Sequence, residues 1–561
     1  MLFHLKMNFM LRSKYCIGIN LKAMFICVLC LWFSSCAKEL DKHSSNPNQL
    51  TAANFYKTPS DANSAILGIY GYITTPFNLG IAGTEVRNQR SDEMSSVSDY
   101  SIYGQHLLGK GSSSYVSDNP YQLMYVALFA ANDALEKIPS IPFSDGKQKD
   151  GYIGEAYFLR AYCHFCLLLN YRNIVLYDKT PNNARDFTQP QAKPDEAWNK
   201  IIADLQKAKK LLPKKGSAFR TGAGLGRATQ GSAAGLLGKA YLYRAGIEKQ
   251  SRFYASSAKT LDTLIRGDFG AYSLMPNYGD NFGAARENND ESVFELQFRA
   301  DIVNISVVPG TANGGLWFEP RSLAPPGFPV QSSGEGVNNN WVLDAFKASA
   351  DASGNLDSRA FGTLIFDDQN IQKKSSDQVT LFEGQNFRQA YPAGKFPGKG
   401  ANFTSCNRKW LDFTLTAAQF KGSARNNGVN YRYLRYSDVL LMFAEALVMS
   451  GSAAGSYSGK TALQAVNDVR QRASVNLPAL YAIDMEAIKK ERILELTNEG
   501  HRFYDLLRWN ELESRFQFLE NADPFFKQFN SYNKYSSKDA YMPIPLVELT
   551  SNPTSKQNDG W

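Results

Sequence analysis

The sequence predicts a mainly α-helical protein built from pairs of helices, with a loop-rich insert that carries short β pieces. Three observations support this fold class. Apolar residues recur at helical spacing in seven segments, these segments arrive in pairs with short links, and the composition changes between residues 268 and 431. Paired helices with short links are typical of superhelical repeats, although the strict 34-residue tetratricopeptide signature is not readable.

The helical segments have apolar residues at helical spacing, and two of them are followed by a proline, Pro139 and Pro213. The fourth segment contains Gly231, Gly235 and Gly238, although each glycine costs a helix about 1 kcal/mol relative to alanine. We therefore expect a neighbouring helix to approach it closely. The segments span residues 123–135, 152–169, 195–212, 227–245, 433–449, 461–473 and 485–497.

The middle of the chain has a different composition. Gly, Asn, Pro and Ser accumulate, as at 309–315 and 325–327, and a short β piece is expected at 292–298. Long loops are uncommon in compact domains unless they are functional. We predict an N-terminal helical-repeat part over 49–267, a loop-rich insert over 268–431, and a C-terminal helical part over 432–561 that closes the same body.

Composition excludes several classes of protein. The 561 residues are 43% hydrophobic, 20% charged and 13% aromatic, which rules out a disordered or collagen-like chain. The formal charge of +8 is mild for this length, so we expect no nucleic-acid partner. Only five histidines are present, which argues against a histidine-rich metal enzyme.

The N-terminus indicates export. Residues 1–35 contain four positive and no acidic residues and end in an apolar run of 11 residues, Ala23–Phe33. A membrane-spanning helix needs about 20 residues, so we predict a signal peptide. Ser34, Ser35 and Cys36 follow and resemble a bacterial lipobox, which implies cleavage before Cys36 and acylation of it. A plain secretory signal is the alternative. Residues 36–48 are polar and are expected to form a flexible tether.

Several short motifs occur in a specific order along almost the whole chain. Together they resemble the SusD/RagB family of Bacteroidetes outer-membrane lipoproteins. Residues 170–175 depart from the family pattern, since they lack its usual Gly and Pro. The motifs include Asn54-Phe55-Tyr56, Ser91-Asp92-Glu93, Ala131-Asn132-Asp133, Gly154–Tyr162, Leu434–Leu441, Val466–Ala473, Glu499–Leu506, Pro543-Ile544-Pro545 and Gln557–Trp561.

The resemblance implies a fold of four tetratricopeptide-like helix pairs and a protein that is not an enzyme. It implies a lipid-anchored protein of the outer membrane, facing the cell surface, that captures oligosaccharides or polysaccharides. The implied partner is a SusC-like TonB-dependent transporter, to which the ligand is delivered. Some branches of the family bind peptides instead. A surface glycoside hydrolase and a scaffold lipoprotein without a ligand are the alternatives to glycan capture.

The charged residues of the motifs are expected to be structural, because a charge within an apolar helix must be paired. Asp92 and Glu93 are not expected to form a glycosidase pair, since sequence neighbours do not generally flank a bond from both sides. We therefore nominate no catalytic residue. The charged residues are Arg160, Arg435, Asp438, Glu445, Arg470, Glu491, Glu495, Glu499, Arg502 and Asp505.

The resemblance places the ligand site by region only, in the loop after Asp92-Glu93 and in the insert. Sugar rings stack on aromatic side chains, while Asn and Arg bind their hydroxyls. Trp341 is a further candidate, but it precedes an apolar run and could equally be a core residue. The candidate residues in those loops are Tyr100, Tyr103, Asn313, Trp317, Phe318 and Arg321.

No cofactor is expected. Residues 351–357 alternate oxygen-bearing side chains like a calcium loop, but they lack the glycine at position six and the distal glutamate. Calcium binding by residues 351–357 therefore remains an alternative, although the calcium-loop motif is incomplete. The sequence does not identify the bound glycan.

Overall fold

The structure is a computed structural model. Met1–Lys57 and Thr58–Trp561 are separate compact units, and the second contains nearly all the described residues. No helix in the described part of the chain is both long and apolar enough to cross a membrane. The structure describes residues 55–75, 85–95, 115–217, 220–298, 325, 336–351, 353–368, 380–396, 403–416, 418–419, 428–453, 455, 457, 459–529 and 535–561.

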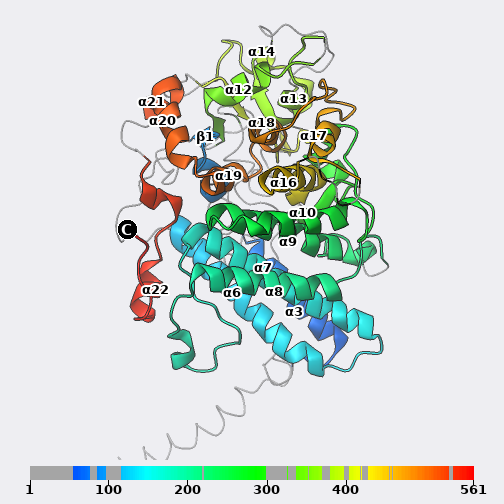
Figure 1. The fold of residues 1–561 in the computed structure, drawn as a ribbon, viewed down its shortest axis with the longest axis vertical. Helices are drawn as coiled ribbons and strands as arrows, with labels where there is room; N and C mark the ends of the chain where they lie inside the picture. Colours follow the sequence, from blue (N-terminus) through cyan, green and yellow to red (C-terminus); the bar gives the residue numbers. More distant parts are fainter. Residues whose placement is uncertain are drawn as a thin grey trace, which may run out of the picture. The chain divides into compact units, whose positions relative to one another are not determined.

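The N-terminal part is a stack of helices in which each helix packs on the next (Figure 1). The predicted helical segments are therefore confirmed as helices, and the expected pairwise arrangement is present. Thr58, Asp145 and Thr229 cap three of the helices through their side-chain oxygens. The helices are α3 (Pro59–Ile73), α6 (Tyr115–Lys137), α7 (Gly146–Tyr171), α8 (Pro194–Leu211), α9 (Gln230–Ile247) and α10 (Arg252–Ile265).

The glycines of α9 let other elements approach its backbone. A Cβ atom on Gly238 would collide with Leu261 of α10, so the predicted close contact with a neighbouring helix is confirmed there. At Gly231 the prediction needs correction, because the neighbour there is Tyr272, which belongs to no helix. Gly235 has a neighbour from α10, Leu264, but its nearest neighbour is Leu434, which also belongs to no helix.

The described residues also form two small antiparallel sheets. The first has four strands in the order β1 (Met94–Ser95), β3 (Val337–Asn338), β5 (Ser405–Asn407) and β4 (Leu364–Phe366). The second pairs β2 (Ser292–Leu296) with β6 (Tyr431–Arg435). The helix predicted from residue 433 was wrong at its start, because residues 433–435 belong to β6 and hydrogen-bond to β2.

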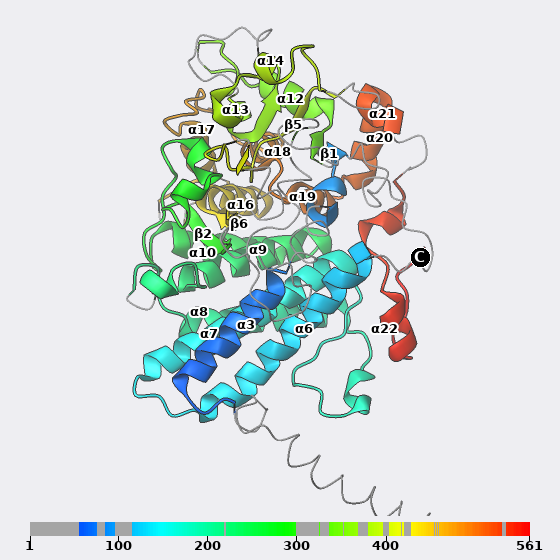
Figure 2. The ribbon, with the colours of Figure 1, turned by 180° about the vertical axis from the view of Figure 1, so that it is seen from behind.

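Of the C-terminal helices, α18 packs against α12 and α13 of the insert (Figure 2). Helix α16 packs on α10, α17 and α18 and joins the two helical parts into one body. The short helices after residue 497 and those within the insert had no clear apolar period and were not predicted. These parts contain α12 (Asn340–Lys347), α13 (Arg359–Thr363), α14 (Phe387–Ala390), α16 (Tyr436–Met449), α17 (Ala462–Arg470), α18 (Met485–Leu496), α19 (Arg502–Trp509), α20 (Leu512–Ala522), α21 (Pro524–Phe529) and α22 (Leu546–Ser551).

All ten charged motif residues form ion pairs, as predicted. Arg435 illustrates the arrangement, because its guanidinium contacts the carboxylates of Glu291, Glu495 and Glu499 and all four side chains are buried. Removing one partner from such a cluster leaves an uncompensated buried charge, which is strongly destabilising. The remaining pairs link the helices of both parts: Arg160–Asp204, Arg470–Glu491, Arg492–Asp438, Arg492–Asp505, Arg502–Asp92 and Arg508–Glu445.

Candidate functional site

An open pocket of about 450 Å³ lies between α12, α20 and the start of α21. We refer to it as the Trp341 pocket. Its volume falls within the range of roughly 300–1,000 Å³ that is usual for ligand sites. The pocket is lined by Asn340, Trp341, Asp344, Ala345, Ile493, Arg515, Phe518, Ala522, Asp523 and Pro524.

Trp341 is the one sequence-predicted ligand residue that the structure describes, and it lines this pocket. It lies in the first turn of α12 and is half-buried. Its backbone N–H donates to Asp523 Oδ2 at 3.3 Å, and its indole Nε1 donates to the carbonyl oxygen of Asp92 at 2.5 Å. Trp341 therefore forms part of the pocket wall, where two hydrogen bonds hold it in place. It is not a fully buried core residue.

Arg515 and Phe518 extend this wall from α20. The Arg515 guanidinium carbon lies 4.8 Å from the Trp341 ring centroid and 4.6 Å from that of Phe518. Phe518 is 42% exposed, so part of its ring is accessible from the solvent. Residues 515 and 518 are one helical turn apart, so both side chains lie on the same side of α20. The three side chains form a row of planar groups along the pocket.

Sequence reasoning missed Arg515 and Phe518. An arginine and a phenylalanine three residues apart were the available signal, but nothing in the sequence shows that they face Trp341. The other candidates, Tyr100, Tyr103, Asn313, Trp317, Phe318 and Arg321, lie outside the described residues, as does Cys36.

Asp92 and Glu93 are buried behind the pocket and do not belong to its lining. Burial alone would raise the pKa of Asp92, but the charges of Arg502 and Arg515 hold it below its usual value. Burial, together with the negative charge of Asp92, raises the pKa of Glu93 to about 8. Neither carboxyl group is open to a substrate, in agreement with the expectation that they are not a glycosidase pair.

The lining carboxylates have different environments. Asp523 is buried, and its Oδ1 accepts hydrogen bonds from the backbone N–H groups of Phe525 and Phe526 at 2.9 and 3.2 Å. Asp344 is exposed, and Lys347 Nζ donates to its Oδ1 at 3.0 Å. Asp523 is thus a buried helix cap. Asp344 is the one exposed carboxylate among the lining residues that the structure describes. The pocket therefore offers aromatic faces and hydrogen-bonding groups rather than an opposed pair of acids.

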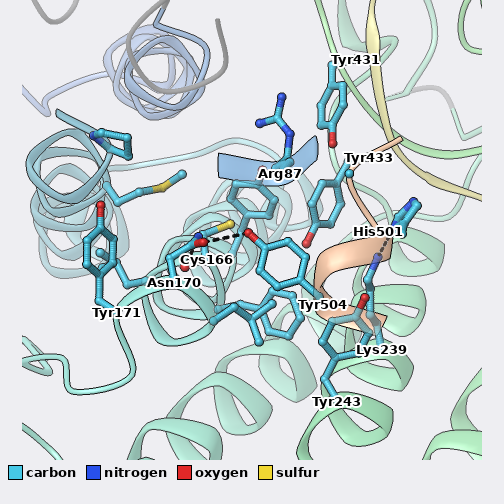
Figure 3. Close-up of a pocket in the computed structure, with 17 residues that line it drawn as sticks. Arg87, Cys166, Asn170, Tyr171, Lys239, Tyr243, Tyr431, Tyr433, His501 and Tyr504 are labelled. Carbon is cyan, nitrogen blue, oxygen red and sulfur yellow. Dashed lines mark hydrogen bonds between the residues drawn. The ribbon is translucent and has the colours of Figure 1, made fainter. Parts of the chain in front are cut away.

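A second, smaller space lies in the helical body between α6, α7, α9 and β6 (Figure 3). We call it the tyrosine cavity. Its lining includes Tyr162, Tyr243, Tyr431, Tyr433 and Tyr504, and Figure 3 shows Tyr433 and Tyr504 turning their hydroxyl groups inward. Its volume of about 60 Å³ is enough for a few water molecules but far below that of ordinary ligand pockets.

The polar groups around the tyrosine cavity are largely matched to one another. Lys239 Nζ lies 3.0 Å from His501 Nδ1 and 3.3 Å from Asp438 Oδ2. Tyr504 donates to Asn170 Oδ1 at 2.8 Å. Burial raises the pKa of the Cys166 thiol to about 12, so this cysteine is not a reactive thiolate. The cavity is an internal packing feature.

The proposed calcium loop gains no support. Asp351 Oδ1 accepts hydrogen bonds from the backbone N–H groups of Ser353 and Asn355, both at 2.8 Å, so it is used to close its own turn. The Asp357 carboxylate is paired with Arg359. Among the described residues, no group of three or more His, Cys, Asp or Glu side chains is arranged to hold a metal ion.

Comparison with known proteins covers both halves of the chain. The model of the SusD family matches residues 270–561, which is more than half of the chain. A second family model, described as "Starch-binding associating with outer membrane", matches residues 64–242. A SusD-like protein of Formosa agariphila is 24% identical over 94% of this chain and 95% of its own.

Solved structures show the same fold. A SusD superfamily protein from Bacteroides vulgatus has a TM-score of 0.71 and 25% identity, covering 91% of this chain and all of that one. Surface glycan-binding protein A from Bacteroides thetaiotaomicron, solved in complex with laminarihexaose, has a TM-score of 0.69 and 19% identity over 90% of this chain and all of its own. The chain belongs to the SusD/RagB family.

Proposed function

We propose that this protein is a lipid-anchored, cell-surface protein of the outer membrane that binds a glycan in the Trp341 pocket and delivers it to a SusC-like TonB-dependent transporter. The observation that carries the proposal is the row formed by Trp341, Arg515 and Phe518 along an open pocket. SusD-family proteins are glycan-binding and non-catalytic, which supports a role in binding without turnover.

The chemistry of the pocket suits a sugar. The C–H faces of a pyranose ring are apolar and pack on aromatic side chains, here Trp341 and the exposed Phe518. The hydroxyl groups around the ring need donors and acceptors at the edges of that surface. Asn340, Asp344 and Arg515 line the pocket and provide both.

The relatives suggest which glycans to test first. One structural relative holds laminarihexaose, and the family model that matches the N-terminal helices is described as starch-binding. We therefore begin with laminarihexaose and starch and continue with plant, fungal and host polysaccharides. The predicted loop residues Tyr100, Tyr103, Trp317 and Phe318, with Asn313 and Arg321, are further proposed contacts.

Trp341→Ala is the direct test of the site. We expect the full chain, purified in detergent, to bind at least one of these glycans, and the variant to lose about tenfold or more in affinity, as for a central aromatic anchor. Tyr481→Ala is the control, since Tyr481 is 97% exposed and lies outside the pocket. Equal binding by Trp341→Ala and wild type, with both folded by circular dichroism, would exclude the pocket. Release of reducing sugar would contradict binding without turnover.

The lipid anchor and the partner require separate measurements. Metabolic labelling with an alkyne fatty acid should mark the wild-type protein and leave Cys36→Ser unlabelled. Co-purification from outer membranes should recover a TonB-dependent barrel together with the protein. A labelled Cys36→Ser protein would disprove the predicted anchor, and isolation without any barrel would count against the delivery role.

A further inference from the structure

We propose that Asp92 is the positioning residue of the Trp341 pocket and that Arg515, which it orients, is a direct sugar contact. The inference rests on the proposed function and adds to it the means by which the pocket is held in shape. One buried residue fixes two side chains of the wall, through its carboxylate and through its main-chain carbonyl.

The carboxylate of Asp92 holds Arg515 from behind. Arg515 Nε donates to Asp92 Oδ2 at 2.7 Å, and Arg502 donates to both oxygens, at 2.7 Å from Nε and 2.9 Å from Nη2. Arg502 is buried, whereas the side chain of Arg515 is 25% exposed and lines the pocket. Charge-assisted hydrogen bonds to a buried carboxylate restrict a long side chain that would otherwise be mobile.

The main-chain carbonyl of the same residue holds Trp341. It accepts hydrogen bonds from the indole Nε1 at 2.5 Å and from Asn339 Nδ2 at 2.9 Å. Asn339 directly precedes α12, so the carbonyl of Asp92 orients both the start of this helix and its tryptophan. The two side chains come from positions 249 and 423 residues away and meet at Asp92.

Arg515 retains donors for a ligand. Its Nε binds Asp92, while its two Nη groups have no hydrogen-bond partner among the residues that the structure describes. A planar guanidinium can donate to two neighbouring oxygen atoms at once. The Nη groups therefore suit adjacent hydroxyl groups of a sugar that is packed against Trp341 or Phe518.

If Asp92 had only a structural role, its substitution would have the same effects as that of any other buried, paired carboxylate. Asp438 is the matched control. Its side chain is also fully buried, and it also pairs with two cations, Arg492 and Lys239. It is not part of the Trp341 pocket. Asp92→Asn and Asp438→Asn should both lower stability, but only Asp92→Asn should change the pocket.

The first readout needs no ligand. In the full chain in detergent, the difference between the emission spectra with and without Trp341→Phe isolates the signal of Trp341. Asp92→Asn keeps the main-chain carbonyl but weakens the hold on Arg515, whose guanidinium lies over the Trp341 ring. We therefore expect it to shift this emission to longer wavelength and to increase its quenching by acrylamide, with no change in Asp438→Asn. An unshifted Trp341 signal in Asp92→Asn, or an equal shift in both variants, would overturn the positioning role.

The second readout is calorimetric titration with laminarihexaose. We expect Asp92→Asn and Arg515→Gln each to weaken binding by about tenfold, as for the loss of one hydrogen bond to a charged group, and Arg515→Lys to recover part of it. Unchanged affinity in Arg515→Gln would overturn the contact role. Should wild type fail to bind laminarihexaose, the choice of glycan in the proposed function fails, while the emission experiment still decides the positioning role. If Asp92→Asn does not fold, Asp92→Glu in the same emission experiment replaces it.

Discussion

The Trp341 pocket and the tyrosine cavity are built from the same kinds of side chain, aromatic rings with a few charged and amide groups, yet they differ in access and in volume. The pocket has about 450 Å³ and contains an exposed phenylalanine. The cavity has about 60 Å³, and of its tyrosine rings those of Tyr162, Tyr243, Tyr431 and Tyr504 are buried while Tyr433 is partly exposed. A surplus of aromatic residues therefore does not identify a sugar site.

The polar groups show the same contrast. At the cavity, Lys239, His501 and Asp438 contact one another, so their charges are satisfied within the protein. At the pocket, Arg515 donates through Nε to Asp92, and its two Nη groups have no hydrogen-bond partner among the described residues, so they can serve a ligand. The difference leads to a clear expectation: changes at the cavity affect folding, and changes at the pocket affect binding.

The largest expected effect is on stability and comes from the cavity. Tyr162→Ala removes a buried ring that contacts Tyr433 at a centroid distance of 4.9 Å. We expect the free energy of unfolding to fall by about 3–5 kcal/mol, as for other large-to-small core changes. Urea denaturation measures this loss. Glycan titration of the folded variant, below its unfolding transition, should show unchanged affinity. A loss of glycan affinity without a loss of stability would contradict the contrast between the tyrosine cavity and the Trp341 pocket.

The second-largest expected effect is the pH dependence of folding stability that His501 causes. Burial, followed by the charge of Lys239, lowers the pKa of His501 from 6.5 to about 4 in the folded protein. The unfolded chain therefore takes up this proton first, so the contribution of His501 to stability is complete above pH 6.5 and is lost as the pH falls towards 4. The loss amounts to at most about 3 kcal/mol, since one pKa unit corresponds to about 1.4 kcal/mol.

His501→Asn is the variant that isolates this effect, because its amide oxygen can still accept a hydrogen bond from Lys239. Urea denaturation between pH 7 and pH 4 should show a smaller loss of stability in the variant than in wild type. Glycan affinity should stay constant from pH 7 to pH 5, because the described lining of the Trp341 pocket contains no histidine. Parallel pH curves for the variant and wild type would contradict the prediction.

The smallest effect in free energy is expected at the pocket. Phe518→Ala should weaken glycan binding by about 1–2 kcal/mol, or roughly 5- to 30-fold, because it removes an apolar surface for the sugar ring. Its effect on unfolding should stay within about 0.5 kcal/mol, as for other exposed positions. Phe187→Ala is the matched control, since Phe187 is 45% exposed and lies outside the pocket. Equal glycan affinities of Phe518→Ala and Phe187→Ala would show that Phe518 does not belong to the binding site.

Much of the fold could be predicted from local pattern. Long helices such as α7 and α8 have apolar residues at a constant period, and Pro213 marks the end of α8, whereas α7 begins six residues before the predicted start. The strand β6 was mistaken for the start of a helix because the apolar period of α16 continues through Tyr433. Its strand conformation depends on hydrogen bonds to β2, which lies more than a hundred residues earlier.

The candidate site was predicted less completely. Trp341 could be nominated because it lies in the insert, where the family resemblance places the ligand site, but whether it was core or surface could not be decided from the apolar run that follows it. Arg515 and Phe518 became recognisable only through their contacts with Trp341. Asp92 belongs to a motif, and the general expectation that buried charges are paired covers its ion pair with Arg502. That expectation does not predict the hydrogen bond from Trp341 to the main-chain carbonyl of Asp92.

The sequence by itself determined that the chain is mainly helical, that its buried charges must be paired, and that it resembles one family from end to end. These properties follow from periodicity, from the cost of burying a charge, and from the order of short motifs. Only the tertiary structure decided which residues form the pocket. Residues 92, 341 and 515 are far apart in sequence, and their contact depends on how α12 and α20 pack around the turn that carries Asp92.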